Sequence, residues 1–397
     1  MELRLDAGEW GQRHGMARLL DALGAGEGLT RYVGGAVRDE LLHLPVSDVD
    51  LATRLRPDEV ITRLEAVKIR AVPTGIDHGT ITAVSSGHAV EITSLRRDVS
   101  TDGRRATVAF TDDWQEDAAR RDFTINALSA DPGTGEVFDY FGGLDDLLAR
   151  RVRFIGDPYE RIAEDHLRIL RFFRFHARFG QGEPDQEALD ACTARANDLM
   201  ALSRERIADE LLKLLSVPDP APTVAIMLER SILRPVVPEI AASAARRLRA
   251  LVAAERDASV EPEALRRLSA LVPRDPAVAE RIAVRLKLST KARKRLACSA
   301  SEDLDANPHA LAYYAGHVCA IDRLLLAGHT REAAAIASWH APRLKIGGGE
   351  LIKRGLRPGP VVAKTLRAIE REWVQEGFPE GDRLEEIVVQ ALGAAAE

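Results

Sequence analysis

The chain has 397 residues, of which 46% are hydrophobic and 29% charged, with a formal net charge of −6 at pH 7. This length is enough for two or three domains, and the composition is typical of a soluble globular protein and excludes a disordered or fibrous one. The sequence contains no apolar run of the roughly 20 residues that a membrane helix needs, and its amino terminus lacks the apolar stretch of a signal peptide. We therefore expect a cytoplasmic protein with no membrane contact and no evident protein partner.

Charges are distributed unevenly along the chain. Residues 102–146 contain eleven acidic residues against four arginines, whereas residues 246–295 contain fourteen Lys and Arg against six Asp and Glu. This asymmetry suggests an acidic end that binds metal and a basic end that binds a polyanion, although two unrelated solvated surfaces would give the same counts. Cys192, Cys298 and Cys319 lie far apart in the sequence, which predicts neither a zinc site nor a disulfide.

Strands and helices alternate in the first part of the chain, to about residue 145. Strands are predicted over 30–33, 48–53, 80–84 and 89–95, and helices over 36–44 and 57–67. Residues 122–130 fit either a helix or a strand. After about residue 146, Leu, Ala, Arg and Glu recur at helical spacing and no β-rich stretch is visible. The sequence thus predicts an α+β fold, with a small mixed sheet followed by an all-helical remainder.

The most informative segment joins a glycine pair to two aspartates. The first strand is expected to end at Gly34 and Gly35, where the backbone can approach a ligand closely, and the following helix start and Arg38 suit a phosphate. Asp48 and Asp50 are two residues apart in the next strand, so both carboxylates would point to one face. A hard divalent cation such as Mg²⁺ would relieve their repulsion. A solvent-exposed acidic edge is the alternative, and the adjoining glycine turn disfavours it.

A third carboxylate would complete a two-metal site for phosphoryl transfer. Glu91, between apolar neighbours on a predicted strand, is the first candidate and Asp98 the second. An exposed strand glutamate without a metal is equally compatible with the sequence.

Two further segments combine arginines with carboxylates or amides. Arg121 could bind a phosphate in bidentate fashion, through two of its guanidinium nitrogens, while Asp122 and Asn126, four residues apart, could bond a ribose if they lie on a helix. An ordinary surface pair of Arg and Asp is the alternative.

The second of these segments, residues 164–175, is predicted as one largely buried helix. Its charged residues follow a slowly turning stripe in which the last four recur every third position: Glu164, Asp165, Arg168, Arg171 and Arg174. Buried arginines need an anion or a planar acceptor. Asp165 and Arg168 together match the edge of a nucleobase, and a ladder of ion pairs within the helix is the alternative.

In this order, GGAVRD, DVD, RRDFTINAL and EDHLRILRFFRF resemble the motifs of the class II tRNA nucleotidyltransferase and bacterial poly(A) polymerase family, and most of all its CCA-adding members. The likeness covers about residues 31–215 and includes 203–211, which resembles the family's neck helix. Residues 351–360 resemble a turn in the family's tail. The resemblance implies a polymerase-beta-like nucleotidyltransferase head (1–145), a helical neck with a base-reading pocket (146–215), a helical body that binds tRNA (216–340) and a helical tail (341–397).

The resemblance also assigns roles to residues. Asp48 and Asp50 would bind catalytic Mg²⁺, and the incoming CTP or ATP would be bound by Gly34, Gly35, Arg38, Arg121, Asp122, Asn126, Glu164, Asp165, Arg168, Arg171 and Arg174. No nucleic-acid template is used, so side chains would select the base. Residues 96–114 fall where family members carry a flexible element needed for the switch from C to A addition.

The expected activity is addition of CCA to the 3′ end of tRNA with release of pyrophosphate. A poly(A) polymerase, or an enzyme that adds only CC or only A, would share the same motifs. A catalytically silent RNA-binding protein is the alternative of another class, and both aspartates that it would be expected to lose are present.

Overall fold

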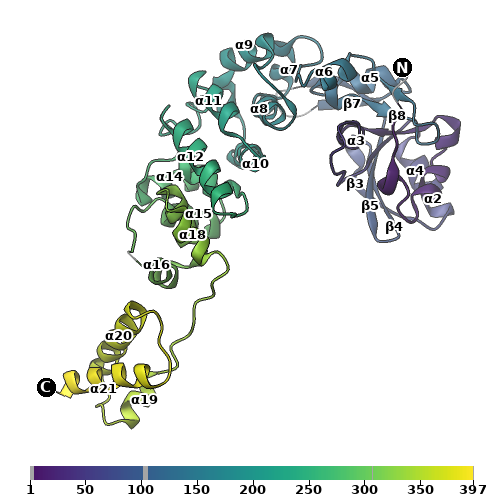
Figure 1. Ribbon diagram of the computed structural model, residues 1–397. Coiled ribbons are helices and arrows are strands. Elements are labelled where there is room, and N and C mark those ends of the chain that lie inside the picture. Colours follow the sequence, from purple (N-terminus) through teal and green to yellow (C-terminus); the bar gives the residue numbers. More distant parts are fainter. Residues whose placement is uncertain (1–3, 102–105, 306, 397) are drawn as a thin grey trace. The chain divides into compact units, whose positions relative to one another are not determined.

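The computed structural model describes residues 4–101, 106–305 and 307–396 (Figure 1). The chain forms two compact units, Met1–Leu214 with Glu229–Val236, and Leu215–Leu228 with Val237–Glu397. The finer division at residues 145, 215 and 340 stays a prediction.

The first unit contains a seven-stranded sheet in the order β3-β4-β5-β2-β1-β8-β9. β2 and β5 are parallel and all other neighbours are antiparallel, so the sheet is mixed, as predicted. Its strands are β1 (Thr30–Val33), β2 (Asp50–Thr53), β3 (Arg70–Gly75), β4 (Thr80–Ser85), β5 (His88–Ser94), β8 (Ser129–Ala130) and β9 (Val137–Phe138). A separate hairpin is formed by β6 (Arg96–Thr101) and β7 (Ala106–Phe110), in the region predicted to hold a flexible element.

Helices of this unit surround the sheet and continue beyond it. They are α1 (Gly8–Gly11), α2 (Met16–Ala22), α3 (Gly35–Leu41), α4 (Pro57–Ala66), α5 (Trp114–Ala119), α6 (Gly143–Leu148), α7 (Pro158–Glu164), α8 (Arg168–Phe179), α9 (Gln186–Ala194) and α10 (Arg204–Leu215). α2 and α4 lie side by side next to the sheet (Figure 1). α4 begins with Pro57 in its first turn, at the residue that the sequence predicted.

Several element boundaries differ from the sequence prediction. β2 begins at Asp50, so Asp48 precedes the strand and is exposed, whereas Val49 between them is buried. α3 ends at Leu41 because His43 takes a positive φ of 55° and Pro45 follows. Residues 122–130 form neither a long helix nor a long strand: a single 3₁₀ turn at Thr124–Asn126 is followed by the two-residue strand β8.

The prediction of one helix over residues 164–175 is wrong. α7 ends at Glu164, Asp165 is extended with φ −148° and ψ 106°, and α8 begins at Arg168. The Asp165 carboxylate accepts a hydrogen bond from the backbone N–H of Leu167 at 3.1 Å. This local bond replaces a helical one, as aspartate side chains do where helices begin. Asp165 therefore lies in the short non-helical segment between α7 and α8 and not on the same helix as the three arginines.

Helices make up the second unit. They are α11 (Ala221–Glu229), α12 (Ala244–Asp257), α13 (Ala264–Leu271), α14 (Pro276–Arg285), α15 (Thr290–Ser299), α16 (Pro308–Ala315), α17 (His317–Leu326), α18 (Thr330–Ile336), α19 (Gly348–Lys353), α20 (Pro360–Gln375) and α21 (Asp382–Ala396). No strand follows β9 in the described part of the chain, which confirms the predicted helical remainder. No described helix is both long enough and apolar enough to cross a bilayer.

Two of the three cysteines are joined, which corrects the prediction of unpaired cysteines. Cys298 and Cys319 form a disulfide with their Cα atoms 6.2 Å apart, although 21 residues separate them in sequence. α15 and α17 pack against each other and bring the two residues together, which the sequence spacing does not show. Cys192 is free and buried, as expected.

Candidate active site

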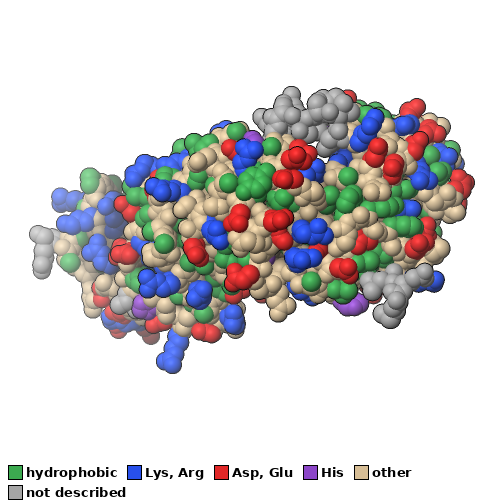
Figure 2. Space-filling model, turned by 90° about the horizontal axis from the view of Figure 1, so that it is seen from above, with side chains coloured by type: hydrophobic (Ala, Val, Ile, Leu, Met, Phe, Trp, Pro, Cys, Tyr) green, Lys and Arg blue, Asp and Glu red, His purple; other side chains and the backbone are tan. Residues whose placement is uncertain are grey.

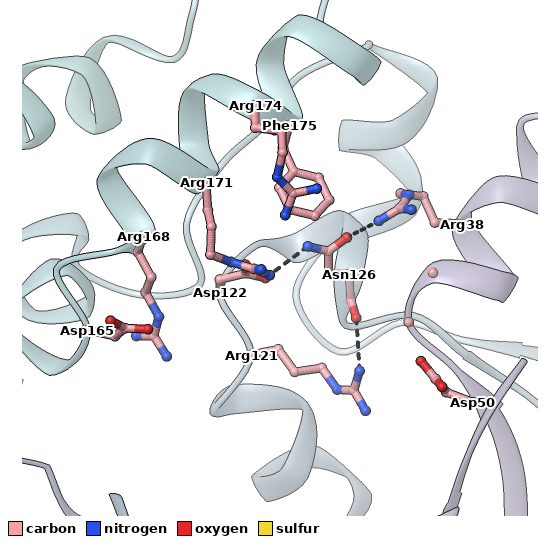
Figure 3. A pocket seen from close by; sticks show the side chains of 12 residues that line it. Arg38, Asp50, Arg121, Asp122, Asn126, Asp165, Arg168, Arg171, Arg174 and Phe175 are labelled. Carbon is pink, nitrogen blue, oxygen red and sulfur yellow. Dashed lines mark hydrogen bonds and ion pairs between the residues drawn. The ribbon is translucent and has the colours of Figure 1, made fainter. Parts of the chain in front are cut away.

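A cavity of about 460 Å³ in the first unit collects most of the residues selected from the sequence. Its lining consists of Gly34, Gly35, Arg38, Asp50, Arg121, Asp122, Asn126, Asp165, Arg168, Arg171, Arg174 and Phe175. Figure 3 shows Asp50 at one end of this row of side chains and Asp165 with Arg168 at the other. Of the residues selected from the sequence, Asp48, Glu91 and Glu164 lie outside the lining, and Phe175 is an addition.

Gly34 forms the turn between β1 and α3. Its φ of 66° and ψ of −122° belong to a region that residues with a Cβ rarely adopt. A Cβ at this position would also lie 3.0 Å from Nη1 of Arg121, which borders the same turn. A side chain here would therefore strain the backbone and displace Arg121 at once.

Asp50 opens β2 and lies beside Glu91, its register partner on the parallel strand β5. Burial raises the pKa of Asp50, and the negative charge of Glu91 raises it further, while Arg121 lowers it and Asp48 adds to the increase. Glu91 and Asp48 therefore both lie near enough to Asp50 to repel its carboxylate. The Asp98 side chain, the second candidate for a third carboxylate, lies outside the described residues.

Arg121 is fixed beside Asp50 by a buried carboxylate. Asp117 on α5 is only 3% exposed and forms ion pairs with Arg120 at 2.8 Å and with Arg121 at 3.4 Å. Burial opposes ionisation of Asp117, but the two guanidinium groups outweigh it and lower its pKa. Arg121 also donates from Nη1 to the backbone carbonyl of Asn126 at 3.4 Å. The guanidinium thus carries its charge into the cavity close to Asp50 (Figure 3).

A chain of hydrogen bonds runs through the middle of the cavity. Arg38 donates to Oδ1 of Asn126, and Nδ2 of Asn126 donates to Oδ1 of Asp122 at 2.8 Å. Arg171 closes the chain with Nε at 2.7 Å and Nη2 at 2.5 Å from Oδ2 of Asp122 (Figure 3). Burial works against the charge of Asp122, but Arg171 and these hydrogen bonds lower its pKa. Asp122 and Asn126 do lie side by side, although a 3₁₀ turn and not a helix brings them together.

The arginines of α8 pair with carboxylates from other elements and not with carboxylates of α8 itself. Glu210 of α10, only 4% exposed, accepts from Nε of Arg174 at 2.6 Å and lies 3.9 Å from Nη1 of Arg171. The apolar residues of α8 are buried: Ile169, Leu170, Phe172, Phe173, Phe175 and Phe179. Of these, Phe175 lies on the cavity side, with the guanidinium groups of Arg171 and Arg174 over its ring. This confirms the predicted apolar surface and shows where the partly buried arginines find their anions.

Asp165 and Arg168 do not pair with each other. Nη2 of Arg206, on α10, lies 3.0 and 3.2 Å from the two carboxylate oxygens of Asp165. Arg168 pairs with Glu164 at 2.5 Å and donates to the backbone carbonyl of Arg161 at 2.9 Å. Both groups still face the cavity, the one as an acceptor and the other as a donor (Figure 3).

Supporting residues of the site were not selected from the sequence: Asp39, Asp117, Arg206 and Glu210. Asp39 holds Arg38 at 2.6 Å and Arg178 at 3.1 Å. Arg206 and Glu210 lie four residues apart and share a helix face. They lie in the segment that resembles the family's neck helix, and their spacing was the available signal that both face the same side.

The carboxylate end of the cavity is where a metal ion would bind. Within the described residues, no group of three or more His, Cys, Asp or Glu side chains converges as a ready-made metal site. Asp50 and Glu91 are nevertheless register partners, and the raised pKa of Asp50 reflects the like charges around it. Hard carboxylate oxygens that repel one another are suited to a divalent cation, so the residues present fit such an ion.

Comparison with known proteins identifies relatives for most of the chain. The poly(A) polymerase head domain family matches residues 30–153, and a family described as the probable RNA and SrmB-binding site of polymerase A matches residues 183–243. The mouse mitochondrial CCA tRNA nucleotidyltransferase 1 is 34% identical over 373 residues, covering 88% of this chain and 83% of that protein. The human protein of the same name is 47% identical over 188 residues, which span 47% of this chain and only 43% of the human one.

Solved structures agree with this assignment. The CCA-adding enzyme of Bacillus stearothermophilus in complex with CTP is 26% identical, with a TM-score of 0.74 over 96% of this chain and 98% of that one. The Thermotoga maritima CCA-adding enzyme complexed with tRNA, at 18% identity and a TM-score of 0.71, shares the fold. The chain therefore belongs to the class II tRNA nucleotidyltransferase and poly(A) polymerase family, together with the CCA-adding enzymes.

Proposed function

We propose that this protein adds C, C and A to the 3′ end of tRNA, using CTP and ATP without a nucleic-acid template and releasing pyrophosphate. The observation that carries the proposal is the single cavity that joins a carboxylate end at Asp50 to an Asp165–Arg168 end through a row of arginines. Such a cavity suits a nucleoside triphosphate, whose phosphates need cations and whose base needs a donor and an acceptor. Membership of the family supports the same function.

At the carboxylate end, Asp48, Asp50 and Glu91 would hold a divalent cation, which we take to be Mg²⁺. When bound, such an ion neutralises phosphate charge and makes a hydroxyl easier to deprotonate. Arg121 and Arg38 would bind the phosphates beside the Gly34 and Gly35 backbone. The chain's own task here is to orient the α-phosphate toward the tRNA 3′-hydroxyl, so that attack and departure of pyrophosphate are in line.

In the middle and at the far end, the side chains would bind the sugar and read the base. Asp122 and Asn126 offer an acceptor and a donor beside Arg171, in reach of a ribose. Asp165 would accept from the exocyclic amine that cytosine and adenine share, and Arg168 would donate to a ring nitrogen or carbonyl. Glu164, Arg171 and Arg174 would hold this end of the cavity in shape through the ion pairs already described.

The basic stretch of the second unit would bind the phosphates of tRNA. Exposed cations there include Arg246, Arg249, Arg256, Arg281, Lys291 and Lys294. Figure 2 shows many Lys and Arg side chains over the C-terminal helices on the face that it draws. Binding through phosphates carries no sequence information and weakens as salt concentration rises. We place the enzyme in the cytoplasm, the compartment expected from the sequence.

Nucleotide addition to a tRNA transcript that lacks its CCA end tests the proposal. With CTP alone we expect two added residues, with both nucleotides a third, and with ATP alone none. Long A tails from ATP alone on unrelated RNA would instead identify a poly(A) polymerase. Addition that stops at CC with both nucleotides present, or A added only to a transcript ending in CC, would identify a partial enzyme. Binding of tRNA with no incorporation under any condition would identify a silent RNA-binding protein.

A further inference from the structure

The Cys298–Cys319 disulfide lies in the second unit, in surroundings that the proposed reaction does not use. It joins the C-terminal end of α15 to the first turn of α17. Cys319 is 7% exposed, whereas Cys298 is half-buried and so is the more accessible of the two. A reagent from solvent therefore reaches the pair through Cys298.

Arg323, one turn further along α17, surrounds Cys298 with hydrogen-bond donors. Its Nε donates to the backbone carbonyl of Cys298 at 2.8 Å, and its Nη1 donates to the backbone carbonyl of Asp303 at 3.1 Å. Its Nη2 lies 3.4 Å from the sulfur of Cys298. In the described part of the chain, no ion pair joins Arg323 to a carboxylate. The guanidinium is thus held by neutral carbonyls with one nitrogen directed at sulfur.

The charges around this sulfur come from several elements. Arg274, in the turn before α14, donates to the carbonyl of Ser301 at 3.1 Å, and its charge repels that of Arg323. Two carboxylates attract these cations, Asp303 acting on Arg323 and Glu302 on Arg274. Asp322, adjacent to Arg323, is fully buried and already shared between Arg266 and Arg295. α16 contributes the carbonyl oxygen of Ala315 at 3.9 Å. Among the described residues, the charged side chain in contact with the sulfur is therefore that of Arg323, a cation.

We propose that Cys298 and Cys319 form a reversible thiol–disulfide site in which Cys298, beside Arg323, is the reactive thiol. A neighbouring cation stabilises a thiolate and makes a cysteine reactive at neutral pH. Reduction would break the S–S bond: a dithiol supplies two electrons and becomes a disulfide, one of its protons goes to Cys319, and the other goes to solvent, which leaves Cys298 as a thiolate. The Cys298 thiolate would then be the anion that Arg323 lacks. This proposal does not depend on the proposed function.

Reoxidation would run through a mixed disulfide with a low-molecular-weight disulfide such as oxidised glutathione. The Cys298 thiolate would attack one of its sulfurs and release one glutathione thiolate, which takes up a proton. Cys319 would then lose its proton, attack the Cys298 sulfur and release the second glutathione. The protein would lose two electrons in all, and the two glutathione molecules would gain them.

Alkylation of the reduced protein tests the assignment of Cys298. The full-length Cys319→Ser variant is treated with iodoacetamide across a pH series, and the peptide containing residue 298 is followed by mass spectrometry. We expect a midpoint at least about one pH unit below the value near 8.5 of an ordinary thiol. Arg323→Gln in the same background should move the midpoint up, and Arg323→Lys should restore part of the shift. Arg331→Gln, at an exposed arginine of α18, is the control that should change nothing.

The outcome that overturns the proposal is an equal midpoint with and without the Arg323 guanidinium in variants that melt at the same temperature. Reversibility is tested on the wild-type chain in glutathione buffers. We expect Cys298 and Cys319 to become protected from maleimide together, while buried Cys192 serves as the internal reference. Reduction should lower the melting temperature by about 5–10 °C, and the Cys298→Ser variant should not respond to reductant. Two free thiols at 298 and 319 in strongly oxidising buffer would also refute the site.

Discussion

Both units contain buried pairs of arginine and carboxylate, yet the pairs are placed differently. In the second unit, Arg267 and Glu255 are 1% and 2% exposed and 2.9 Å apart, and Arg267 also donates to the backbone carbonyls of Leu215 and Pro218. In the first unit, the side chain of Arg171 is 31% exposed and borders a cavity while it pairs with Asp122. The same kind of ion pair ties helices together where it is fully buried, as in the second unit. It remains available to a ligand where one side borders a cavity, as in the first unit.

The largest expected effect follows removal of charge at the carboxylate end of the cavity. Asp50→Asn should slow transfer of CMP from CTP to tRNA by about 10³-fold or more, because about 4 kcal/mol of transition-state stabilisation is lost with a metal ligand. Asp48→Asn should also abolish efficient transfer, because Asp48 is the second aspartate proposed to hold the same ion. Single-turnover incorporation measures the rate, and a gel shift measures tRNA binding, which should be unchanged.

Asp58→Asn is the matched control for these variants, because Asp58 is an exposed aspartate of α4 in the same unit. It should retain the wild-type rate. Wild-type incorporation by Asp50→Asn would refute the metal assignment, since the raised pKa of Asp50 would then reflect burial and crowding alone.

In the buried ion-pair network of Arg266, Arg267 and Glu255 in the second unit, the largest effect should be on stability. Arg267→Ala leaves Glu255 buried beside Arg266 alone and three carbonyls without a donor, so we expect a loss of about 3–5 kcal/mol in the free energy of unfolding. Urea unfolding followed by circular dichroism measures it. Arg249→Ala, at an exposed arginine of α12, should change stability by no more than about 0.5 kcal/mol. A loss below about 1 kcal/mol for Arg267→Ala would remove the contrast between the units.

A smaller effect is expected at the far end of the cavity, on the choice of nucleotide. Arg168→Ala should raise KM for CTP and ATP and reduce discrimination between them by about tenfold to a hundredfold, since one charged hydrogen bond contributes about 1.5–3 kcal/mol. Arg206→Ala should act in the same direction through Asp165, and Arg206→Lys should recover part of the loss. Steady-state kinetics with each nucleotide measures both.

Asp209→Ala provides the control for Arg206, because Asp209 lies on the same helix in an exposed pair with Lys213. Unchanged KM values in the Arg168→Ala variant would count against base reading at this end. A fall in kcat with unchanged KM and unchanged base choice for Arg206→Ala would assign that residue a purely structural role.

The smallest effect concerns acid stability. Asp122 has a lower pKa in the folded protein than the ordinary value near 3.9, so its ion pair stabilises the fold above about pH 4, and this contribution is lost as the pH falls below it. Arg171→Gln should reduce that part of the acid sensitivity. Urea unfolding at pH 7 and pH 3.5 measures the difference between wild type and variant, and equal pH dependence would show that Asp122 does not depend on Arg171 for its ionisation.

Patterns that depend on neighbouring residues could be read from the sequence. The glycine turn, the short strands and the apolar face of α8 follow from local conformational preference and periodicity. Most cavity residues were found because motif order and residue type point to the same chemistry. The break at Asp165 was missed because a side-chain bond to the Leu167 N–H competes with the helix, and helical spacing alone does not reveal such a bond.

Contacts between distant segments could not be predicted in the same way. Arg206 lies 41 residues from Asp165, and Glu210 lies 36 residues from Arg174. Cys298 and Cys319 meet because two helices pack together, which no spacing rule encodes. In each case the partner is fixed by tertiary packing, so one sequence supplies the residue types but not the pairing.

The most direct test of the account is incorporation of labelled nucleotides into a tRNA transcript without its CCA end. The account predicts two C residues from CTP, a terminal A once ATP is present, and loss of both in Asp50→Asn with tRNA binding retained. Binding of tRNA by wild type without any incorporation, or incorporation that survives in Asp50→Asn, would contradict it.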